Sequence, residues 1–357
     1  MPKNNILDTS PRFKRDPGSV GASIFRLADQ LRDGLAQARR IRLPFAAKDI
    51  HNVLAVGMGG SHLGTDMIIS AVSGRLEKPV HIVNDYEVPG WVNSKTLVVC
   101  SSYSGNTEES VAALRIAHQR HAKIVVMTSG GTLAREARKH KLALYHFAPS
   151  ENPSGQPRLG VAYGLSALLV CWKKLGVLRM DQAEFDRLPI TAWEAIKRLQ
   201  PSVPIEKNAA KQLALAWAEK IPLIVGAPWA NGNMHTFANQ IQENAKTYAA
   251  WNEIPELNHH LMEGLRDKDI AKQMHAVFIE DFRHFAGLKK RFTLTKKIFR
   301  NLGITLSTYK PRGGVPLDQA IDLLVFSSYV SWYLSIVKKV DPAPIPTVDY
   351  LKQHLKK

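Results

Sequence analysis

A run of small hydroxyl residues stands where a phosphate group could bind. Residues 101–109 read SSYSGNTEE and follow the apolar run 97–100. Hydroxyl side chains and a glycine at the start of a helix form a neutral phosphate cradle, because the first backbone N–H groups of the helix also face the anion. No lysine is present, which excludes a nucleotide-type P-loop. Because a single helix cap needs only one hydroxyl, we predict that Ser102, Ser104 and Thr107 bind the phosphate of a small phosphomonoester.

A glycine-rich turn precedes this cradle. Residues 57–64 read GMGGSHLG and follow the apolar run 52–56. Glycines let the backbone approach an anion closely, so Gly60 and Ser61 are predicted to close over the phosphate. Two alternatives remain at this point. The turn could be a variant of the dinucleotide fingerprint, with Asp85 about 20 residues after Gly64, or a glycine turn needed only for packing.

The two segments together resemble the phosphosugar-binding SIS (sugar isomerase) domain. Two further segments narrow the resemblance: QENAK at 242–246 and PELNH at 255–259. They are similar to signatures of the bifunctional phosphoglucose/phosphomannose isomerases, within the phosphoglucose isomerase superfamily. The resemblance covers about residues 50–357; the first 45 residues carry no matching motif.

The resemblance implies an intramolecular oxidoreductase of glycolysis and gluconeogenesis. Such an enzyme interconverts glucose-6-phosphate, and mannose-6-phosphate as well, with fructose-6-phosphate through a cis-enediol. It needs no cofactor, and the family works as a homodimer. The alternatives are another phosphosugar isomerase, such as one for amino sugars, and a non-catalytic SIS-type regulator that senses a phosphosugar. A regulator needs the phosphate cradle but no catalytic base.

The resemblance also assigns roles to two residues of the second half. Glu243 corresponds to the base that moves a proton between C1 and C2. His259 corresponds to the ring-opening histidine, which in the family reaches the active site of the partner subunit. The family often has asparagine after this histidine, whereas this chain has His260, so the sequence leaves open which imidazole acts. A metal site is not expected, because adjacent histidines rarely converge on one ion and no ligand set at suitable spacing accompanies them.

Two cations complete the expected site. Arg158, in PSGQPR at 153–158, corresponds to the family arginine that stabilises the enediolate, and a planar delocalised cation suits that role. Lys352, in DYLK at 349–352, corresponds to the C-terminal active-site lysine. Its register is open, because Lys356 and Lys357 follow closely.

Short apolar runs separated by helical stretches predict the elements that position these residues. Such runs are typical of parallel strands covered on both faces. In the first half they lie at 52–57, 80–83, 97–100, 123–127 and 142–147, and in the second half at 222–226, 275–279 and 304–309. The fold class is therefore α/β, and the resemblance implies two tandem SIS domains, each a mostly parallel sheet in a three-layer αβα arrangement.

The predicted domains follow from this pattern. They are an N-terminal arm and helix at 1–45, SIS domain 1 at 46–175, a linker with a short helix at 176–206, SIS domain 2 at 207–345 and a C-terminal helix at 346–357. Domain 1 is expected to bind the phosphosugar, and domain 2 to carry Glu243 and His259.

The chain is strongly basic, with 48 Lys and Arg against 31 Asp and Glu. Residues 1–45 and 283–313 each hold nine Lys or Arg, and the second stretch has no acid. Such a charge suits nucleic acid or an anionic small molecule; with the phosphate motifs in hand, nucleic acid is the less favoured partner. The helix at 286–301 is expected to pack on the core with a basic outer face, its apolar side formed by Leu288, Phe292, Ile298, Phe299 and Leu302.

The composition excludes several other classes of protein. Two cysteines, Cys100 and Cys171, cannot build a disulfide framework and are expected in the core. No run of about 20 apolar residues indicates a membrane span, and the N-terminus lacks the apolar region of a secretory signal. A reducing cytoplasm is the expected location.

Overall fold

The first half of the chain folds around a parallel sheet. The structure is a computed structural model that describes residues 6–280 and 286–355. The strand order is β2-β1-β3-β4-β5, and every neighbouring pair is parallel. The strands are β1 (Asn52–Val56), β2 (Val80–Val83), β3 (Thr96–Ser101), β4 (Lys123–Thr128) and β5 (Ala143–His146).

Helices cover both faces of this sheet, which explains the continuous apolar runs. The connecting helices are α5 (Gly60–Val72), α6 (Glu108–Gln119), α7 (Gly131–Lys139) and α8 (Val161–Lys174). Every residue of β3 is buried, as expected for a strand without a solvent face. Leu54 and Val98 pack on one face with α6 and α7, while Val53 and Val99 join the central core on the other.

The second half repeats the architecture with four strands in the described residues. The order is β7-β6-β8-β9, again parallel. The strands are β6 (Ile221–Gly226), β7 (Ala250–Glu253), β8 (Met274–Ile279) and β9 (Thr305–Tyr309), and the long helices are α10 (Ala209–Ala216), α11 (Asn231–Ala245), α14 (Ala286–Asn301) and α15 (Pro316–Val337). The two-sheet α/β fold expected from the sequence is confirmed.

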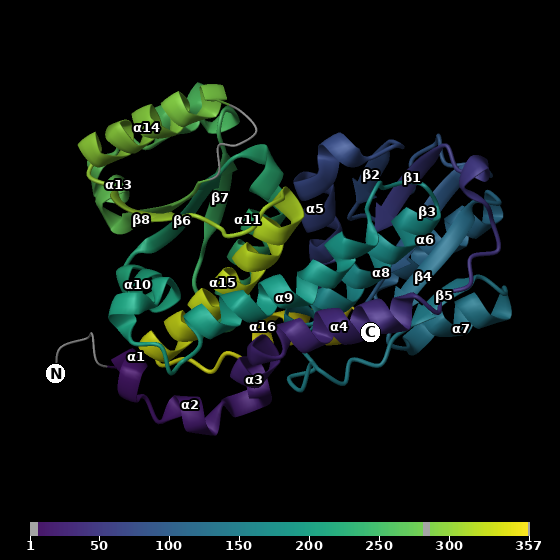
Figure 1. Cartoon of the computed structure of the whole chain (residues 1–357), viewed down its shortest axis with the longest axis horizontal. Coiled ribbons are helices and arrows are strands. Elements are labelled where there is room, and N and C mark those ends of the chain that lie inside the picture. Colours follow the sequence, from purple (N-terminus) through teal and green to yellow (C-terminus); the bar gives the residue numbers. More distant parts are fainter. Residues whose placement is uncertain (1–5, 281–285, 356–357) are drawn as a thin grey trace.

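A shared layer of helices separates the two sheets (Figure 1). In it α11 packs on α5 and α15, so one core cluster reaches from Val53 of the first sheet to Val277 of the second. Helix α15 is apolar and long enough to cross a membrane, with a mean hydropathy of 1.5, but 94% of its most apolar window is buried inside the protein. A core position therefore accounts for its composition.

The N-terminal segment joins both halves of the molecule. It contains α1 (Ile6–Thr9), α2 (Arg12–Arg15), α3 (Val20–Phe25) and α4 (Leu27–Ala38). Helix α4 packs on α8 of the first half, while α1 and α3 pack on α15 of the second. Phe13 makes edge contacts with the rings of Trp332 and Tyr333. Figure 1 shows this purple segment running along one side of both domains.

The segment between the two sheets differs from the short linker helix expected. It holds α9 (Gln182–Leu199), an 18-residue helix. Asp181 caps it by accepting from the N–H of Glu184, whose side chain accepts from Asp181 N. This capping box stabilises the first turn, and Pro189 lies inside the helix without ending it. Because α9 packs against both α4 and α15, it is part of the shared helical layer.

A buried lysine fixes the start of the N-terminal segment. Lys211 is fully buried, and its Nζ lies 2.8 Å from Asp8 Oδ1 and 2.8 Å from the carbonyl of Pro201. A buried ammonium needs such partners, because an unpaired charge in the interior is costly.

We expect Asp8→Asn to lower the free energy of unfolding by about 1–3 kcal/mol, since the amide leaves the buried Lys211 without its counter-charge. Urea denaturation measures the change. The matched control is Asp29→Asn, whose partner Arg32 is 67% exposed, and it should change stability by less than about 0.5 kcal/mol. Equal effects of the two substitutions would show that the ion pair does not hold α1.

The basic helix α14 packs on the outer face of the second sheet, as expected, and four of the five predicted apolar residues take part, namely Leu288, Phe292, Phe299 and Leu302. Phe292, Thr295 and Phe299 are buried, whereas Ile298 is 36% exposed. The buried positions follow helical spacing, so the apolar face includes a threonine and excludes the predicted isoleucine. Cys100 and Cys171 are both free and buried, which confirms their expected place in the core.

Short elements complete the described chain. The remaining α-helices are α12 (Leu261–Gly264), α13 (Lys268–Gln273) and α16 (Pro346–His354), and the 3₁₀ turns are η2 (Pro17–Ser19), η3 (Ala47–Asp49), η4 (Ser73–Arg75), η5 (Pro157–Leu159), η6 (Ile205–Lys207), η7 (Pro228–Ala230) and η8 (Glu256–His259).

Candidate active site

The two phosphate motifs meet at one edge of the first sheet. The glycine turn follows β1 and the serine loop follows β3, which are adjacent parallel strands with Val56 beside Cys100. The chain leaves β1 toward β2 on one side, while β3 lies on the other. This is a topological switch point, the place where parallel α/β sheets bind ligands outside the carboxyl ends of their strands.

Internal hydrogen bonds shape the serine loop. Ser102 Oγ lies 2.8 Å from Thr107 Oγ1 and accepts from the N–H of Gly105 at 3.0 Å. Gly105 has a φ of +72°, and a Cβ there would lie 1.9 Å from the Gly130 carbonyl. Only glycine fits such a position. Ser104 is exposed at the tip of the loop, where its hydroxyl is accessible to a ligand.

Ser61 ties the glycine turn to the serine loop. Its Oγ accepts from the N–H of Tyr103 at 2.7 Å, and its carbonyl accepts from Ser101 Oγ at 2.9 Å. Gly60 in turn faces the next segment, because a Cβ on it would lie 2.7 Å from the backbone N of Arg158. The glycine therefore permits a close approach of two backbones, and it brings the cradle directly against Arg158.

Arg158 is the most heavily bonded side chain of the site and is 1% exposed. A guanidinium has five N–H donors, and this one makes five hydrogen bonds. They run from Nε to Asn244 Oδ1 (2.6 Å), from Nη1 to Gln156 Oε1 (2.8 Å) and Glu243 Oε2 (2.9 Å), and from Nη2 to the carbonyls of Pro342 (2.8 Å) and Ala343 (3.0 Å).

These bonds join three distant segments of the chain at one cation. Burial lowers the pKa of Arg158, and the neighbouring Glu243 opposes that shift. The Glu243 side chain is 29% exposed, so its carboxylate is open to a ligand on one side and paired on the other. Glu243 lies at the end of α11, so a partly solvated carboxylate from the second domain lies beside the predicted phosphate cradle of the first.

Lys246 is a site residue that the motif contained but the sequence reasoning did not assign. It ends α11 with a φ of +52°. Its Nζ donates to the carbonyls of Glu243 and Pro344, and burial lowers its pKa. Lys246 and Arg158 therefore hold the same segment, 342–344, against the C-terminal end of α11. The sequence signal for it is the signature itself, because QENAK ends in this lysine.

His259, His260 and Lys352 are not bonded to this cluster in the described residues. All three are exposed, on η8, after η8 and on α16. His260 Nε2 is 3.9 Å from Glu256 Oε1. Within the described part of the chain, neither His259 nor Lys352 makes a hydrogen bond or ion pair with Arg158 or Glu243. Helix α16 nevertheless approaches the site, because Asp349 acts electrostatically on Arg158. The structure therefore brings together Gly60, Ser61, Ser102, Ser104, Thr107, Arg158 and Glu243, but not the other three.

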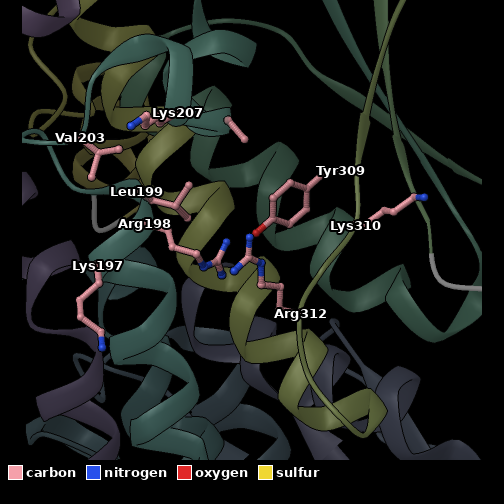
Figure 2. Close-up of a pocket in the computed structure, with 9 residues that line it drawn as sticks. Lys197, Arg198, Leu199, Val203, Lys207, Tyr309, Lys310 and Arg312 are labelled. Atoms are coloured by element: carbon pink, nitrogen blue, oxygen red, sulfur yellow. The ribbon is translucent and has the colours of Figure 1, made fainter.

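A hollow lies away from these residues, between α9, α10 and the end of β9. It has a volume of about 360 Å³ and is lined by basic side chains around Tyr309, namely Lys197, Arg198, Lys207, Lys310 and Arg312. Figure 2 shows Arg198 and Arg312 pointing toward the Tyr309 hydroxyl. Tyr309 and Arg198 both donate to the buried Asp322, whose pKa is raised by burial. None of the predicted site residues lines this hollow.

Known proteins match both halves of the chain. Residues 50–157 match the SIS domain family, and residues 206–355 match the bacterial phospho-glucose isomerase C-terminal SIS domain. Among solved structures, a hypothetical protein from Thermus thermophilus superposes with a TM-score of 0.74 at 16% identity, over 99% of this chain and 93% of that one. The match to the SIS family favours the phosphosugar interpretation of the glycine turn over the dinucleotide one.

Full-length relatives agree with the domain matches. A bifunctional phosphoglucose/phosphomannose isomerase from Caldicellulosiruptor bescii is 32% identical over 93% of this chain and 98% of its own length. Another from Aquifex aeolicus is 28% identical over 87% of this chain and 93% of its own length. The chain therefore belongs to the family of bifunctional phosphoglucose/phosphomannose isomerases, with two SIS domains in tandem.

Proposed function

We propose that this chain interconverts glucose-6-phosphate and mannose-6-phosphate with fructose-6-phosphate. The observation that carries the proposal is the ion pair of Arg158 Nη1 with Glu243 Oε2 at 2.9 Å, directly against the phosphate cradle. A regulator that only senses a phosphosugar needs no partly exposed carboxylate beside a buried cation. The names of the full-length relatives support the same pair of substrates.

The proposed reaction is a proton transfer between neighbouring carbons. The substrate phosphate binds Ser102, Ser104, Thr107 and the start of α6, with Gly60 and Ser61 closing over it. Glu243 removes the proton from C2 of the aldose while the carbonyl oxygen at C1 gains a proton, which gives the cis-enediol. The O2 hydroxyl then loses its proton as C1 receives one from Glu243, and the ketose forms. Arg158 stabilises the negative charge that develops on the oxygens.

Ring opening needs a further group, and we assign it to His259 of the partner subunit in a homodimer. The exposed position of His259 on η8 suits delivery to a second copy. Large exposed side chains offer apolar area for such an interface, among them Tyr248 at 70%, Tyr350 at 65% and Leu351 at 57% exposure. Lys352 on α16 would act at the same site. Light scattering of the active enzyme tests the dimer, and a monomer mass would contradict it.

Separate coupled assays with glucose-6-phosphate and mannose-6-phosphate test the activity. We expect fructose-6-phosphate from both substrates, without added metal or redox cofactor, in an enzyme of the cytoplasm. Activity with an amino-sugar phosphate alone would favour another phosphosugar isomerase. Binding without turnover of any phosphosugar would favour the regulatory alternative and would overturn the proposal.

The phosphate cradle has its own test in Ser104→Ala combined with Thr107→Ala. Hydrogen bonds to a charged group contribute about 1.5–3 kcal/mol each, so losing two should raise KM by at least roughly 100-fold while kcat changes little. Steady-state kinetics with fructose-6-phosphate measure KM and kcat separately. Ser202→Ala, at an exposed turn after α9, serves as the control and should match the unmodified enzyme. An unchanged KM in the double variant would place the phosphate elsewhere.

A further inference from the structure

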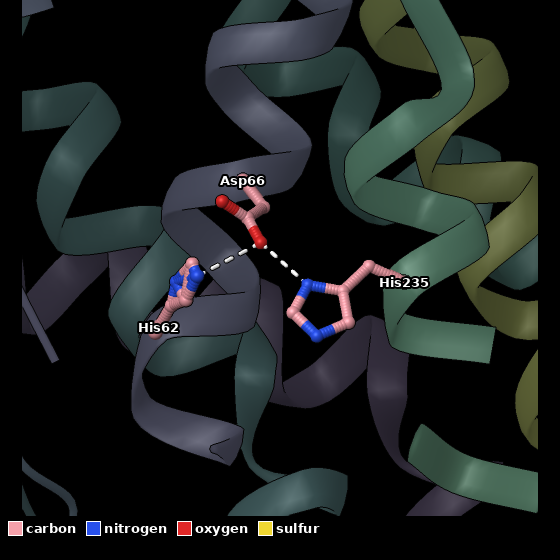
Figure 3. Close-up of side chains that lie close together, drawn as sticks. All are labelled: His62, Asp66 and His235. Atoms are coloured by element: carbon pink, nitrogen blue, oxygen red, sulfur yellow. Dashed lines mark hydrogen bonds and ion pairs between the residues drawn. The ribbon is translucent and has the colours of Figure 1, made fainter. Parts of the chain in front are cut away.

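Two histidines and an aspartate converge where the two domains cross. His62 and Asp66 lie one turn apart on α5, and His235 projects from α11 of the other domain (Figure 3). Asp66 Oδ2 is 2.9 Å from His62 Nε2 and 2.7 Å from His235 Nδ1. All three ligand atoms lie within 4.8 Å of one another.

The backbone around this cluster is closely packed. Gly232 sits on α5 so tightly that a Cβ there would lie 2.1 Å from the carbonyl carbon of Asp66. Its N–H also donates to Ser70 Oγ at 3.1 Å. The crossing of α5 and α11 is therefore fixed at the turn that precedes His235, and the three side chains are presented by two rigid helices rather than by loops.

We propose that His62, Asp66 and His235 form a binding site for a divalent transition metal ion of the zinc type. Two imidazole nitrogens and one carboxylate oxygen are a ligand set that such ions prefer, with bonds of about 2.0–2.2 Å. Ligand atoms of one tetrahedral ion lie roughly 3.3 Å apart. The three ligand atoms here lie within 4.8 Å of one another, so small side-chain rotations bring them to that geometry. The N–H protons that now face Asp66 leave when the ion binds.

The surroundings support imidazole ligands at these positions. The rings of His235 and Trp251 stack with centroids 4.6 Å apart, which fixes the orientation of the imidazole. The amide nitrogen of Asn239 lies 3.5 Å from His235 Nε2, and a flip of this amide brings its oxygen there to accept the proton of a ring bound through Nδ1. His62 is 6% exposed, and its Nδ1 has no hydrogen-bond partner among the described residues. Its Nε2, which lies 2.9 Å from Asp66 Oδ2, is therefore the nitrogen available to a metal ion.

Partial exposure leaves room for a water or another ligand on the ion. The side chains of Asp66 and His235 are 16% and 26% exposed, so solvent reaches the open side of the cluster. A bound ion would link α5 of the phosphate-binding domain to α11, the helix that carries Glu243. This inference does not depend on the proposed isomerase activity, since none of the three residues belongs to the catalytic cluster.

Metal titration of the chelator-treated full-length chain tests the site. With Co²⁺ as probe, we expect visible absorption that saturates at one equivalent, and with Zn²⁺ a rise in the melting temperature. His235→Gln, at a partly exposed position, should weaken the Co²⁺ affinity by about tenfold or more and remove the Zn²⁺-dependent rise. Circular dichroism confirms that this variant is folded.

A second histidine pair provides the matched control. The rings of His118 and His140 lie 4.2 Å apart on the first domain, so His140→Gln removes an imidazole from a competing cluster and should leave the saturating absorption unchanged. Because His62 is buried, Asp66→Asn serves as the second ligand variant, and it too should weaken binding. The proposal is overturned if no saturable Co²⁺ absorption appears, or if His235→Gln and His140→Gln bind the ion equally well.

Discussion

Glutamine in place of Glu243 should stop isomerisation while leaving phosphosugar binding intact. The amide oxygen of the substituted side chain can still accept from Arg158 Nη1, so the local geometry persists, but an amide cannot take up a proton from carbon. A positioned general base contributes about 10²–10⁴-fold to a proton transfer, and kcat should fall by that factor with little change in the dissociation constant. Exchange of the C2 proton with deuterated solvent, followed by NMR, measures the step directly.

The matched control for this variant is Glu194→Gln. Glu194 lies on α9 and its side chain is 59% exposed, paired with Lys197 alone in the described residues. Its loss removes the same charge at a distance from the site and should leave kcat unchanged. Proton exchange at a near-normal rate in Glu243→Gln would show that another group is the base.

Arg158→Met should lower both the stability of the fold and the rate of turnover. The substitution removes five hydrogen bonds and leaves the acceptors of Asn244, Pro342 and Ala343 without their donor. Removing one partner of a buried ion pair costs about 3–5 kcal/mol. Urea denaturation should report a loss of that size, and turnover should fall by at least about 10²-fold because the developing enediolate loses its cation.

Arg158→Lys separates the charge from the geometry. Lysine keeps the positive charge but has three donors on one atom, so it cannot reach all five acceptors. We expect stability between that of the unmodified enzyme and that of Arg158→Met. Arg115→Met is the control, because Arg115 is 61% exposed and only 3.5 Å from Glu136 at its closest. Stability of Arg158→Met equal to that of this control would contradict the role given to the five bonds.

The strands of both sheets could be predicted because burial on both faces leaves a continuous apolar run. β7 escaped prediction for the opposite reason: its four residues are all half-buried at a sheet edge, so the sequence AWNE has no apolar run to detect. The sequence predicts only a short helix where α9 runs for 18 residues, because the segment is polar and contains prolines. The capping box at Asp181 and the buried residues Phe185, Leu188 and Ile196 stabilise the full helix.

Candidate site residues that lie in short motifs can be predicted from the sequence. Contacts between residues far apart in the chain cannot. Two local segments predict Gly60, Ser61, Ser102, Ser104 and Thr107, and a family signature predicts Glu243; their binding and catalytic roles stay predictions. The network around Arg158 joins this residue to partners that lie 85 and 184 positions further along the chain. No local sequence pattern encodes such pairs. The same holds for Asp8 with Lys211 and for His62 with His235, because single contacts between distant residues leave no periodicity.

The five bonds of Arg158 also set an order for biosynthesis. Its acceptors Glu243 and Asn244 follow it by 85 and 86 positions, and the carbonyls of Pro342 and Ala343 follow it by 184 and 185. Domains fold from the N-terminus as they leave the ribosome, so the first domain must form while its arginine is still hydrated. The cluster around Arg158 can therefore close only after Ala343 has been synthesised, and a nascent chain stalled before that point holds the serine loop without the full set of Arg158 acceptors.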